Sequence, residues 1–282
     1  MKVAYQGVPG AYSEAALRLH FGEAAEPLGF AFSEQVFDAV EDGRADAGFV
    51  PVENSIAGSV GVNTDLLLER AVVAIAEAYL PIDHCLLALP GARLEDVAVV
   101  YSHPIALAQC RDFLQRRKLR PIPEYDTAGA AELVAKRGIS GEAAIASKRC
   151  AEVYGLSVLA EDIQSVKGNF TRFLAFRRGS DAPPGLKTEK TSLAFSVQHH
   201  PGALLDCLKL FADHAINLTK LESRPIAANP FEYSFFVDFL GGTGDAAVAA
   251  ALAELRATAR QVKVLGSYPL VERPTISGPR PG

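Results

Sequence analysis

Residues 177–185 read RRGSDAPPG, and they divide the chain into two parts with different patterns of apolar and polar residues. Prolines, glycines and charged residues concentrated in so short a stretch are typical of a linker. Before this stretch, strands and helices are predicted to alternate. After it, the alternation starts again as a smaller unit. A length of 282 residues also exceeds one average domain. We therefore expect at least two domains.

The first part alternates short apolar runs with segments of helical periodicity. The predicted strands are 3–6, 47–50, 72–78, 84–89, 97–101, 143–146 and 169–176. The predicted helices are 12–21, 33–43, 63–70, a segment starting at Pro104, 128–137 and 147–154. Ser33 is expected to cap its helix, and Pro51 to end the strand before it. This order predicts an α/β fold with parallel strands.

The second part predicts a βαββαβ order, which is a ferredoxin-like module. Its predicted elements are strand 191–198, helix 201–214, strands 216–221 and 232–240, helix 245–260 and strand 262–267. The predicted domain limits are residues 1–180 for the first domain, 181–189 for the linker, 190–270 for the second domain and 271–282 for a tail. The tail is expected to be mobile because it is rich in proline and glycine.

The composition narrows the class of function. A net charge of −5 argues against broad nucleic-acid or anionic-membrane binding, since both need a basic surface. The 4 cysteines are scattered without a C-x-x-C pair, so neither a disulfide framework nor a zinc site is predicted. The N-terminus opens directly into a strand without a signal-peptide pattern. We expect a cytoplasmic protein with no membrane span.

The segment Asn169-Phe170-Thr171-Arg172-Phe173 combines a hydroxyl, a permanent cation and two aromatic rings. On a strand, Thr171 and Phe173 share one face and Arg172 points to the other unless the strand end twists. Arg172 can grip a carboxylate with two hydrogen bonds, or form a surface or lobe-to-lobe ion pair. Phe173 can wall a ring or pack in the core. Thr171 alone is also compatible with an ordinary strand threonine.

Three turns at strand ends are candidate anion sites, because free backbone N–H groups at helix starts attract negative charge. They are Gly7 to Ser13, Asn54-Ser55 and Ser102-His103. Each is equally compatible with plain turn and capping chemistry. His103 can titrate near neutral pH, although a histidine before proline is as often a cap.

Taken in order and spacing, the motifs resemble the prephenate dehydratase family. They are Gln6-Gly7-x-x-Gly10-x-x-Ser13, Pro51-Val52-Glu53-Asn54-Ser55, Ser102-His103-Pro104 with Gln109, and Asn169-x-Thr171-Arg172-Phe173. With Gly202-Ala203-Leu204-Leu205 and Glu222-Ser223-Arg224-Pro225, the second part resembles an ACT regulatory domain. No helical mutase segment precedes residue 1, so the monofunctional form is expected. The resemblance implies a two-lobed catalytic domain similar to periplasmic binding proteins, with its site in the cleft.

The resemblance also implies a lyase that expels water and carbon dioxide from prephenate to give phenylpyruvate, with no cofactor and no metal. Thr171, Arg172 and Phe173 would then be catalytic. The substrate-binding residues would be Glu53, Asn54, Ser55, Ser102, His103, Gln109 and Asn169. A threonine is a poor general acid, so Thr171 is expected to donate a hydrogen bond to the leaving oxygen. Glu53, protonated through burial, would supply the proton.

By the same resemblance, the ACT domain would bind phenylalanine between two subunits, so that a dimer or tetramer is expected. The implied residues are Gly202, Ala203, Leu204, Leu205, Asn217, Glu222, Ser223, Arg224 and Pro225. Glu222 and Arg224 can instead stabilise one another. Two other functions remain open: arogenate dehydratase, which is the same elimination on the amino-acid counterpart, and a non-catalytic amino-acid-binding protein.

Overall fold

The computed structural model describes residues 1–179, 183, 185–198, 200–226 and 229–274. These form two compact units. The first contains Met1–Val60, Ala78–Phe173 and residues 273–274, and the second contains Gly61–Glu77 and Leu174–Glu272, less the undescribed positions. Parts of the predicted linker (180–182 and 184) and tail (275–282) lie outside the described residues, and the predicted domain limits stay a prediction.

The first unit begins with an α/β lobe built around strand β1 (Lys2–Gln6). Strands β2 (Glu26–Phe30) and β3 (Ala47–Asn54) flank β1 in parallel, and β4 (Gly58–Ser59) pairs with the end of β3. Helices α1 (Tyr12–Phe21) and α2 (Ser33–Glu41) connect these strands. The parallel pairing fits the predicted alternation of strands and helices.

Three details of this lobe differ from the sequence prediction. Strand β3 runs through Pro51 to Asn54, because proline lacks only an N–H donor and the pairing to β1 covers Ala47 to Phe49. Phe32 occupies the N-cap of α2, and the Ser33 hydroxyl donates to Gln6 Oε1 at 2.9 Å instead of capping the helix. Strands β2 and β4 were not predicted.

The second lobe of the first unit is a five-stranded sheet in the order β10-β6-β9-β7-β8. Its strands are β6 (Cys85–Ala88), β7 (Val99–Ser102), β8 (Arg120–Pro123), β9 (Glu142–Ala146) and β10 (Ser157–Ala160). Strand β7 pairs in parallel with β8 and β9, whereas β6 pairs antiparallel with β9 and β10. The predicted parallel sheet is therefore mixed, since β6 enters from the opposite direction.

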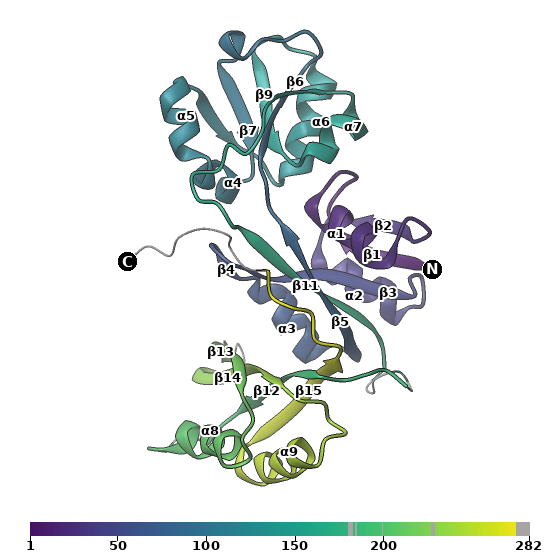
Figure 1. The fold of residues 1–282 in the computed structure, drawn as a ribbon, viewed down its shortest axis with the longest axis vertical. Coiled ribbons are helices and arrows are strands. Elements are labelled where there is room, and N and C mark those ends of the chain that lie inside the picture. The colour runs from purple at the N-terminus through teal and green to yellow at the C-terminus, as the bar shows by residue number, and fades with distance from the viewer. Residues whose placement is uncertain (180–182, 184, 199, 227–228, 275–282) are drawn as a thin grey trace. The chain divides into compact units, whose positions relative to one another are not determined.

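Helices cover both faces of this sheet (Figure 1). The helices are α4 (Pro104–Gln109), α5 (Arg111–Arg117), α6 (Thr127–Arg137) and α7 (Lys148–Tyr154). Neighbouring residues of β9 pack into two separate hydrophobic cores. Ala144 packs with Val134 of α6, whereas Ile145 packs with Leu107 of α4. Burial on both faces explains why β9 is apolar throughout.

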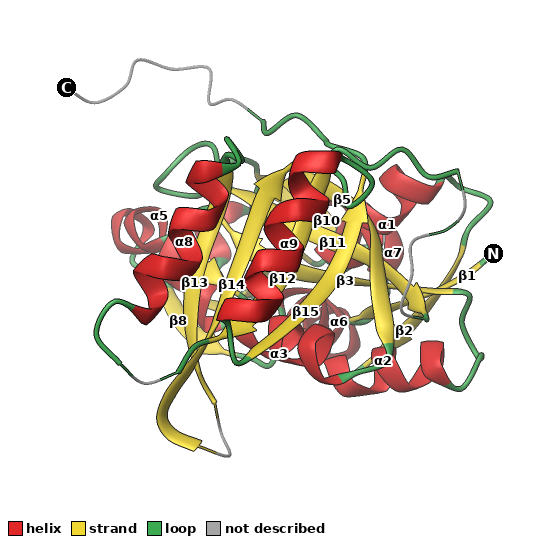
Figure 2. Ribbon diagram, turned by 90° about the horizontal axis from the view of Figure 1, so that it is seen from below, coloured by secondary structure: helices red, strands yellow, loops and turns green. Residues whose placement is uncertain are grey.

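The second unit contains the ferredoxin-like module. Its elements are β12 (Lys190–Ser196), α8 (Ala203–Asp213), β13 (Leu218–Ile226), β14 (Asn229–Leu240), α9 (Ala246–Thr258) and β15 (Gln261–Tyr268). Their order confirms βαββαβ, and the strands lie as β13-β14-β12-β15 with antiparallel pairing. Helices α8 and α9 cover one face of this sheet (Figure 2). Phe195, Phe211, Phe239 and Leu255 fill the core between them.

The second unit also includes α3 (Gly61–Glu69), which follows the first lobe in sequence. Strands β5 (Val72–Pro81) and β11 (Phe170–Arg178) each begin in one unit and end in the other.

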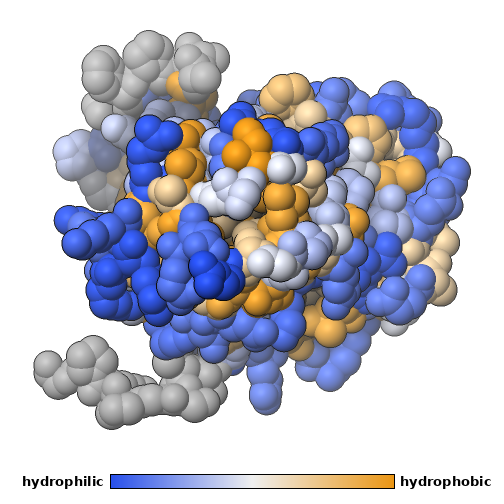
Figure 3. Space-filling model, turned by 90° about the horizontal axis from the view of Figure 1, so that it is seen from above, coloured by the Kyte–Doolittle hydropathy of each residue, from blue (hydrophilic) through white to orange (hydrophobic). Residues whose placement is uncertain are grey.

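The surface mixes residues of opposite character. On the face drawn in Figure 3, hydrophilic and hydrophobic residues are interspersed. Among the described residues, no helix has the length and apolar character needed to cross a bilayer.

Candidate active site

A cavity of about 380 Å³ lies in the first unit. Its volume suits a small-molecule ligand. Side chains from both lobes line it, including Tyr12, Ser13, Asn54, Thr171 and Phe173 from the first lobe and its strand β11, and His84, His103, Gln109, Asp126 and Thr127 from the second. The motifs far apart in sequence thus meet at one place.

Asn54 ends strand β3, and its side-chain orientation is fixed by the backbone. Its Oδ1 accepts from the N–H groups of Ile56 at 3.1 Å and Ala57 at 2.8 Å. Since a backbone N–H can only donate, this atom must be the oxygen. The Nδ2 of Asn54 therefore donates to Thr171 Oγ1 at 3.0 Å and to Asn169 Oδ1 at 2.7 Å.

The Thr171 hydroxyl consequently has a defined polarity. Its oxygen accepts from Asn54, and the described residues offer its proton no acceptor within the protein. A threonine hydroxyl has one proton to donate. Thr171 can thus donate a hydrogen bond to a molecule in the cavity.

Residues 171–173 alternate as the strand period predicts. Thr171 and Phe173 line the cavity, and the Phe173 ring also stacks on Phe49 with centroids 5.1 Å apart. Arg172 does not line it. Its side chain is 4% exposed, and Nη1 lies 3.8 Å from Glu53 Oε2. This placement corresponds to the ion-pair alternative for Arg172. Glu53 is 37% exposed, so the burial expected to keep it protonated is not present.

Other predicted substrate residues are not among those that line the cavity. Ser102 is fully buried and donates to the Ile145 carbonyl at 2.6 Å. Ser55 accepts from the Phe170 N–H at 2.9 Å. Asn169 is 3% exposed and joins Asn54 to Gln109 through hydrogen bonds. These side chains hold the strands and amides in place but do not line the cavity.

His103 lines the cavity and caps α4, since its Nδ1 accepts from the Ile105 N–H at 3.2 Å. Burial lowers the pKa of His103, against an opposing effect of the Asp126 carboxylate. Capping of α4 is therefore the role of His103 for which the structure shows a hydrogen bond.

The described lining residues include no lysine or arginine. An anionic ligand would thus depend on hydroxyl, amide and backbone N–H donors. The first turn of α1 contributes Tyr12 and Ser13, and that of α6 contributes Thr127. Helix starts of this kind favour negative charge.

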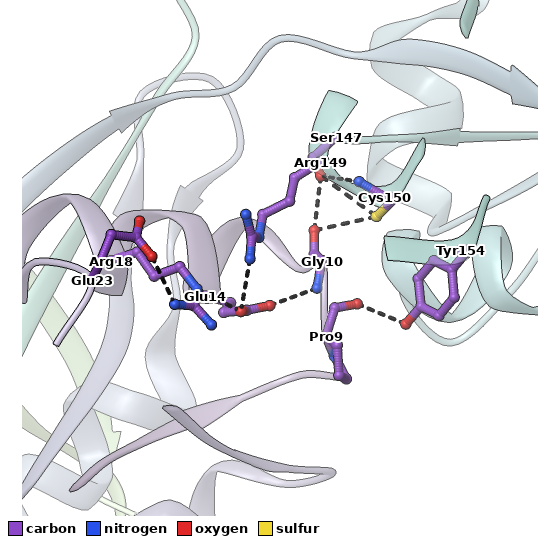
Figure 4. Close-up of polar contacts among 9 residues, drawn as sticks. All are labelled: Pro9, Gly10, Glu14, Arg18, Glu23, Ser147, Arg149, Cys150 and Tyr154. Carbon is purple, nitrogen blue, oxygen red and sulfur yellow. Dashed lines mark hydrogen bonds and ion pairs between the residues drawn. The ribbon is translucent and has the colours of Figure 1, made fainter. Parts of the chain in front are cut away.

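The glycine-rich turn between β1 and α1 binds the second lobe, as Figure 4 shows. The Ser147 hydroxyl donates to the Gly10 carbonyl at 2.8 Å, and the Tyr154 hydroxyl donates to the Pro9 carbonyl at 2.6 Å. Gly10 has φ +88°, and a Cβ there would lie 2.9 Å from the Cys150 sulfur. The backbone at Gly10 thus approaches helix α7 too closely for a side chain.

Glu14 supports this turn from within α1. Glu14 is 3% exposed. Its Oε2 accepts from the Gly10 N–H at 2.7 Å, and its Oε1 accepts from Arg18 Nε at 2.8 Å. Although burial opposes it, these two bonds and the nearby Arg149 lower the pKa of Glu14.

Sequence reasoning missed His84, Tyr12, Asp126 and Thr127 as cavity residues. His84 directly precedes β6, and its ring lies between the Tyr12 hydroxyl and the Gln109 amide. Asp126 and Thr127 begin α6 at a cap signal that the sequence carries, Asp before an alanine-rich helix. No motif marked them as ligands. Among the described residues, no cluster of potential metal ligands is present.

A second cavity, of about 350 Å³, lies in the second unit beside the start of α8. Four predicted regulatory residues line it: Gly202, Ala203, Leu204 and Leu205. Gly202 is the N-cap with φ +89°, a conformation that favours glycine. The other lining residues were not predicted: Val197, Gln198, His200, and Glu232, Tyr233 and Phe235 of β14.

The other predicted regulatory residues do not line this cavity in the single chain. They are Asn217, Glu222, Ser223, Arg224 and Pro225. Glu222 Oε2 lies 3.2 Å from Lys220 Nζ. Arg224 pairs with Asp65 of α3 through Nη2 and Oδ2 at 2.7 Å. Lys220 is thus an ion-pair partner of Glu222, and Asp65 is an ion-pair partner of Arg224.

Helix α3 is held to the ferredoxin-like module at a second point. Lys263 of β15 donates to the carbonyls of Leu67, Leu68 and Arg70 at 3.0, 2.7 and 2.7 Å. A lysine at this position satisfies carbonyls that the helix end leaves unpaired. Residue 60, directly before α3, lines the active-site cavity.

Comparisons with known proteins agree with this layout. The family model for prephenate dehydratase matches residues 3–181, and the ACT domain model matches residues 191–257. The chain is 39% identical to the arogenate dehydratase/prephenate dehydratase 1, chloroplastic, of Arabidopsis thaliana over 96% of this chain and 72% of the relative.

Two solved structures are also similar. One is a prephenate dehydratase in complex with L-Phe from Arthrobacter aurescens, with 34% identity, a TM-score of 0.87 and coverage of 95% of this chain and 89% of that one. The other is GqqA, described as a novel type of quorum quenching acylase, with 35% identity, a TM-score of 0.88 and coverage of 96% and 98%.

Proposed function

Because the chain belongs to the prephenate dehydratase family of lyases and carries a C-terminal ACT domain, we propose that it converts prephenate to phenylpyruvate, carbon dioxide and water. The observation that carries the proposal is the hydrogen bond from Asn54 to Thr171, which leaves the threonine proton to face the cavity. The poor leaving group of this elimination is a ring hydroxyl, so a donor at the departing oxygen is the group that the reaction needs.

In this proposal, Thr171 donates to the leaving oxygen while the C–O bond breaks. The ring carboxylate leaves as carbon dioxide, and its bonding electrons enter the ring, which becomes aromatic. The departing hydroxide gains a proton and leaves as water. Phe173 provides an apolar wall for the ring, and the Gln109 amide with the helix starts provides donors for the carboxylates. The immediate source of the proton is separate from Thr171, whose own pKa is far too high for net transfer.

Arogenate is the second candidate substrate, and Asp126 is the observation that favours it. This carboxylate lines a cavity whose described lining residues include no lysine or arginine. Arogenate carries an ammonium group where prephenate carries a ketone, and a carboxylate attracts an ammonium group. The relative from Arabidopsis thaliana bears both activities in its name.

The similarity to GqqA suggests amide hydrolysis as a further candidate activity. An acylase needs a nucleophile with an adjacent proton acceptor. Thr171 instead receives a hydrogen bond from the Asn54 amide, and an amide NH2 group cannot take up the hydroxyl proton. The cavity geometry therefore favours elimination over acyl transfer at Thr171.

We further propose that phenylalanine binds at the cavity beside α8 and alters turnover. Gly202 allows a close approach to backbone N–H groups at the helix start, and Leu204 and Phe235 supply apolar surface. Leu205, which is 67% exposed, is available to a second copy of the chain. A dimer or tetramer would complete the pocket with Asn217 and residues 222–225.

The test is turnover of purified protein on prephenate and on arogenate, with phenylpyruvate and phenylalanine as the respective products. We expect product and carbon dioxide in equal amounts, and little of either from Thr171→Val, whose side chain keeps the shape and loses the hydroxyl. Hydrolysis of an N-acyl amide is measured in parallel. A folded wild-type protein that turns over neither carboxylic acid would overturn the proposal.

A further inference from the structure

The polarity of the cavity's hydrogen bonds can be followed beyond Thr171. The backbone fixes Asn54, so Asn54 Nδ2 donates to Asn169 Oδ1 at 2.7 Å. The other half of the Asn169 amide is then Nδ2, which donates to Gln109 Oε1 at 3.3 Å. Each amide has one acceptor end and one donor end, so fixing the first fixes the next. The Gln109 oxygen is therefore turned toward Asn169.

Gln109 Oε1 also lies 2.8 Å from His84 Nε2. An amide oxygen can only accept, so this ring nitrogen carries a proton. The Gln109 NH2 group therefore points away from both Asn169 and His84, and Gln109 is one of the residues that line the cavity. The opposite ring nitrogen of His84, Nδ1, lies 2.9 Å from the Tyr12 hydroxyl, which also lies 2.8 Å from the Asp83 carbonyl oxygen. With Nε2 protonated in a neutral ring, Nδ1 is an acceptor, so the Tyr12 proton is shared between Nδ1 and that carbonyl.

His84 is held firmly in this position. It is 2% exposed, its backbone N–H donates to Gln164 Oε1 at 3.0 Å, and its ring contacts the Tyr12 ring edge-on with centroids 5.7 Å apart. Burial lowers the pKa of His84, against opposing effects of the Gln109 hydrogen bond and the Asp83 carboxylate. The groups that face the ring are thus Tyr12, Gln109 and the nearby Asp83.

We propose that His84 is a positioning residue: its Nε2–H fixes the oxygen of Gln109, so that the Gln109 NH2 group donates to an oxygen of the substrate. The proposal rests on the function proposed above and adds a residue to its site. Without His84, the Gln109 amide can rotate and present its oxygen to an anionic substrate, which would repel it. Asn169 alone holds the amide through a longer bond of 3.3 Å.

The kinetic test compares His84→Leu, His84→Gln and Gln109→Leu. His84→Leu removes the donor, and we expect kcat to fall about 10²-fold, the scale of a misplaced catalytic geometry. His84→Gln keeps an N–H donor near the Nε2 position and should restore at least about ten-fold of that loss. In the double variant with Gln109→Leu, His84→Leu should cause little further loss, because the two residues act as one unit.

Tyrosine variants provide a matched pair. Tyr12→Phe removes the hydroxyl that contacts His84 Nδ1 and the Asp83 carbonyl, whereas Tyr101→Phe removes a buried bond to Glu142, 2.9 Å long, outside the cavity. We expect Tyr12→Phe to lower kcat more than Tyr101→Phe does at equal thermal stability. Equal effects of the two, a folded His84→Leu variant within about three-fold of wild type, or additive losses in the double variant would each overturn the proposal.

A spectroscopic measurement separates this inference from the proposed reaction. Nitrogen-15 NMR of the His84 ring should show protonation at Nε2 and not at Nδ1 in the wild type, with the signal changed in Gln109→Leu. This readout does not depend on turnover. An Nδ1-protonated ring would overturn the positioning role even in an active enzyme. Absent turnover with an Nε2-protonated ring would overturn the proposed reaction and, with it, the role in catalysis.

Discussion

Asn54 donates to the Thr171 hydroxyl oxygen at 3.0 Å while its own oxygen accepts from the backbone N–H groups of Ile56 and Ala57. A turn in the first lobe thereby sets the direction of a hydrogen bond on strand β11. Because backbone N–H groups can only donate, they fix the position of the Asn54 oxygen and leave its NH2 group to face Thr171. The threonine proton faces the cavity as a consequence of this one contact.

Asn54→Asp should be more damaging than its small size change suggests. A carboxylate only accepts, so the Thr171 hydroxyl would turn and donate to it, and its proton would leave the cavity. We expect kcat to fall by about 10²–10³-fold, the scale of losing one preorganised donor. Steady-state kinetics at pH 7, with folding checked by circular dichroism, measure this. An aspartate variant as active as wild type would contradict the donor role of Thr171.

Thr171→Ser and Thr171→Val separate the hydroxyl from the shape of the side chain. The serine keeps a donor within reach of Asn54, so we expect a loss of less than about ten-fold in kcat. The valine keeps the volume but should lose about 10²–10³-fold. The comparison is made on kcat because the contact is expected to strengthen in the transition state. Equal activity of serine and valine variants would leave Thr171 with a packing role only.

Arg172→Leu should leave substrate affinity largely intact. The guanidinium does not line the cavity and lies 3.8 Å from Glu53. We expect KM to change by less than about ten-fold, since removing a direct bidentate contact to a carboxylate would cost more than about 1.4 kcal/mol, which is ten-fold. Thermal stability should fall, because the charged partner loses its ion pair. A KM raised by a hundred-fold or more would return Arg172 to the role of a carboxylate ligand.

The sequence pattern predicted the α/β class of the first part and the βαββαβ order of the second, whereas the two-lobed arrangement of the first part was implied only by the family resemblance. The alternation before residue 177 predicted the helices and most strands, and the restart after residue 185 predicted the βαββαβ module. It missed β2, β4, β8 and β10. The β2 segment, Glu26 to Phe30, contains a proline and a glycine and lacks strict alternation. The sequence pattern ended β3 too early because proline usually interrupts a strand. The cytoplasmic location stays a prediction.

Site residues could be predicted only where they belong to a recognisable sequence motif. Thr171, Asn54 and Gln109 belong to recognisable patterns, and the structure brings them to one cavity. His84 lies alone before an apolar strand, where a core histidine is the usual interpretation. Its partners Tyr12 and Gln109 are 72 and 25 residues away in sequence, so only tertiary structure reveals the contact. Ser102 shows the opposite case, a motif residue whose hydroxyl belongs to the core.

Arg224→Gln should weaken the response of turnover to phenylalanine more than it changes turnover itself. Arg224 holds Asp65 of α3 at 2.7 Å, and α3 directly follows Val60 of the active-site cavity. A ligand beside α8 that shifts the ferredoxin-like sheet should also move α3. The reason is that the Arg224–Asp65 ion pair and the Lys263 hydrogen bonds connect α3 to that sheet. Phenylalanine titrations of turnover measure the response, with Lys209→Ala in the exposed pair with Asp213 as the control.

The reversed pair Arg224→Asp with Asp65→Arg provides the complementary experiment. It should recover part of the lost response, because the attraction is restored with its charges exchanged. An unchanged phenylalanine response in Arg224→Gln would exclude the Arg224–Asp65 contact as the route of coupling.

Glu14 should make the stability of the first unit depend on pH in the acid range. Its pKa is lowered in the folded state from an ordinary value of 4.5, despite burial, by bonds from the Gly10 N–H and Arg18. An acid whose folded pKa is depressed contributes full stability above its unfolded pKa. The contribution is lost as pH falls from about 4.5 through the folded pKa, because the unfolded state binds the proton first.

Glu14→Gln tests this directly by urea unfolding at pH 7 and pH 4. We expect the variant to be less stable at pH 7 by about 1.5–3 kcal/mol, the scale of a hydrogen bond to a charged group. The difference should shrink as the pH approaches 4 and the wild type loses the contribution. Glu23→Gln is the control, since Glu23 also pairs with Arg18 but is 83% exposed and should change stability little. A difference that stays constant between the two pH values would show that Glu14 acts through its shape and not its charge.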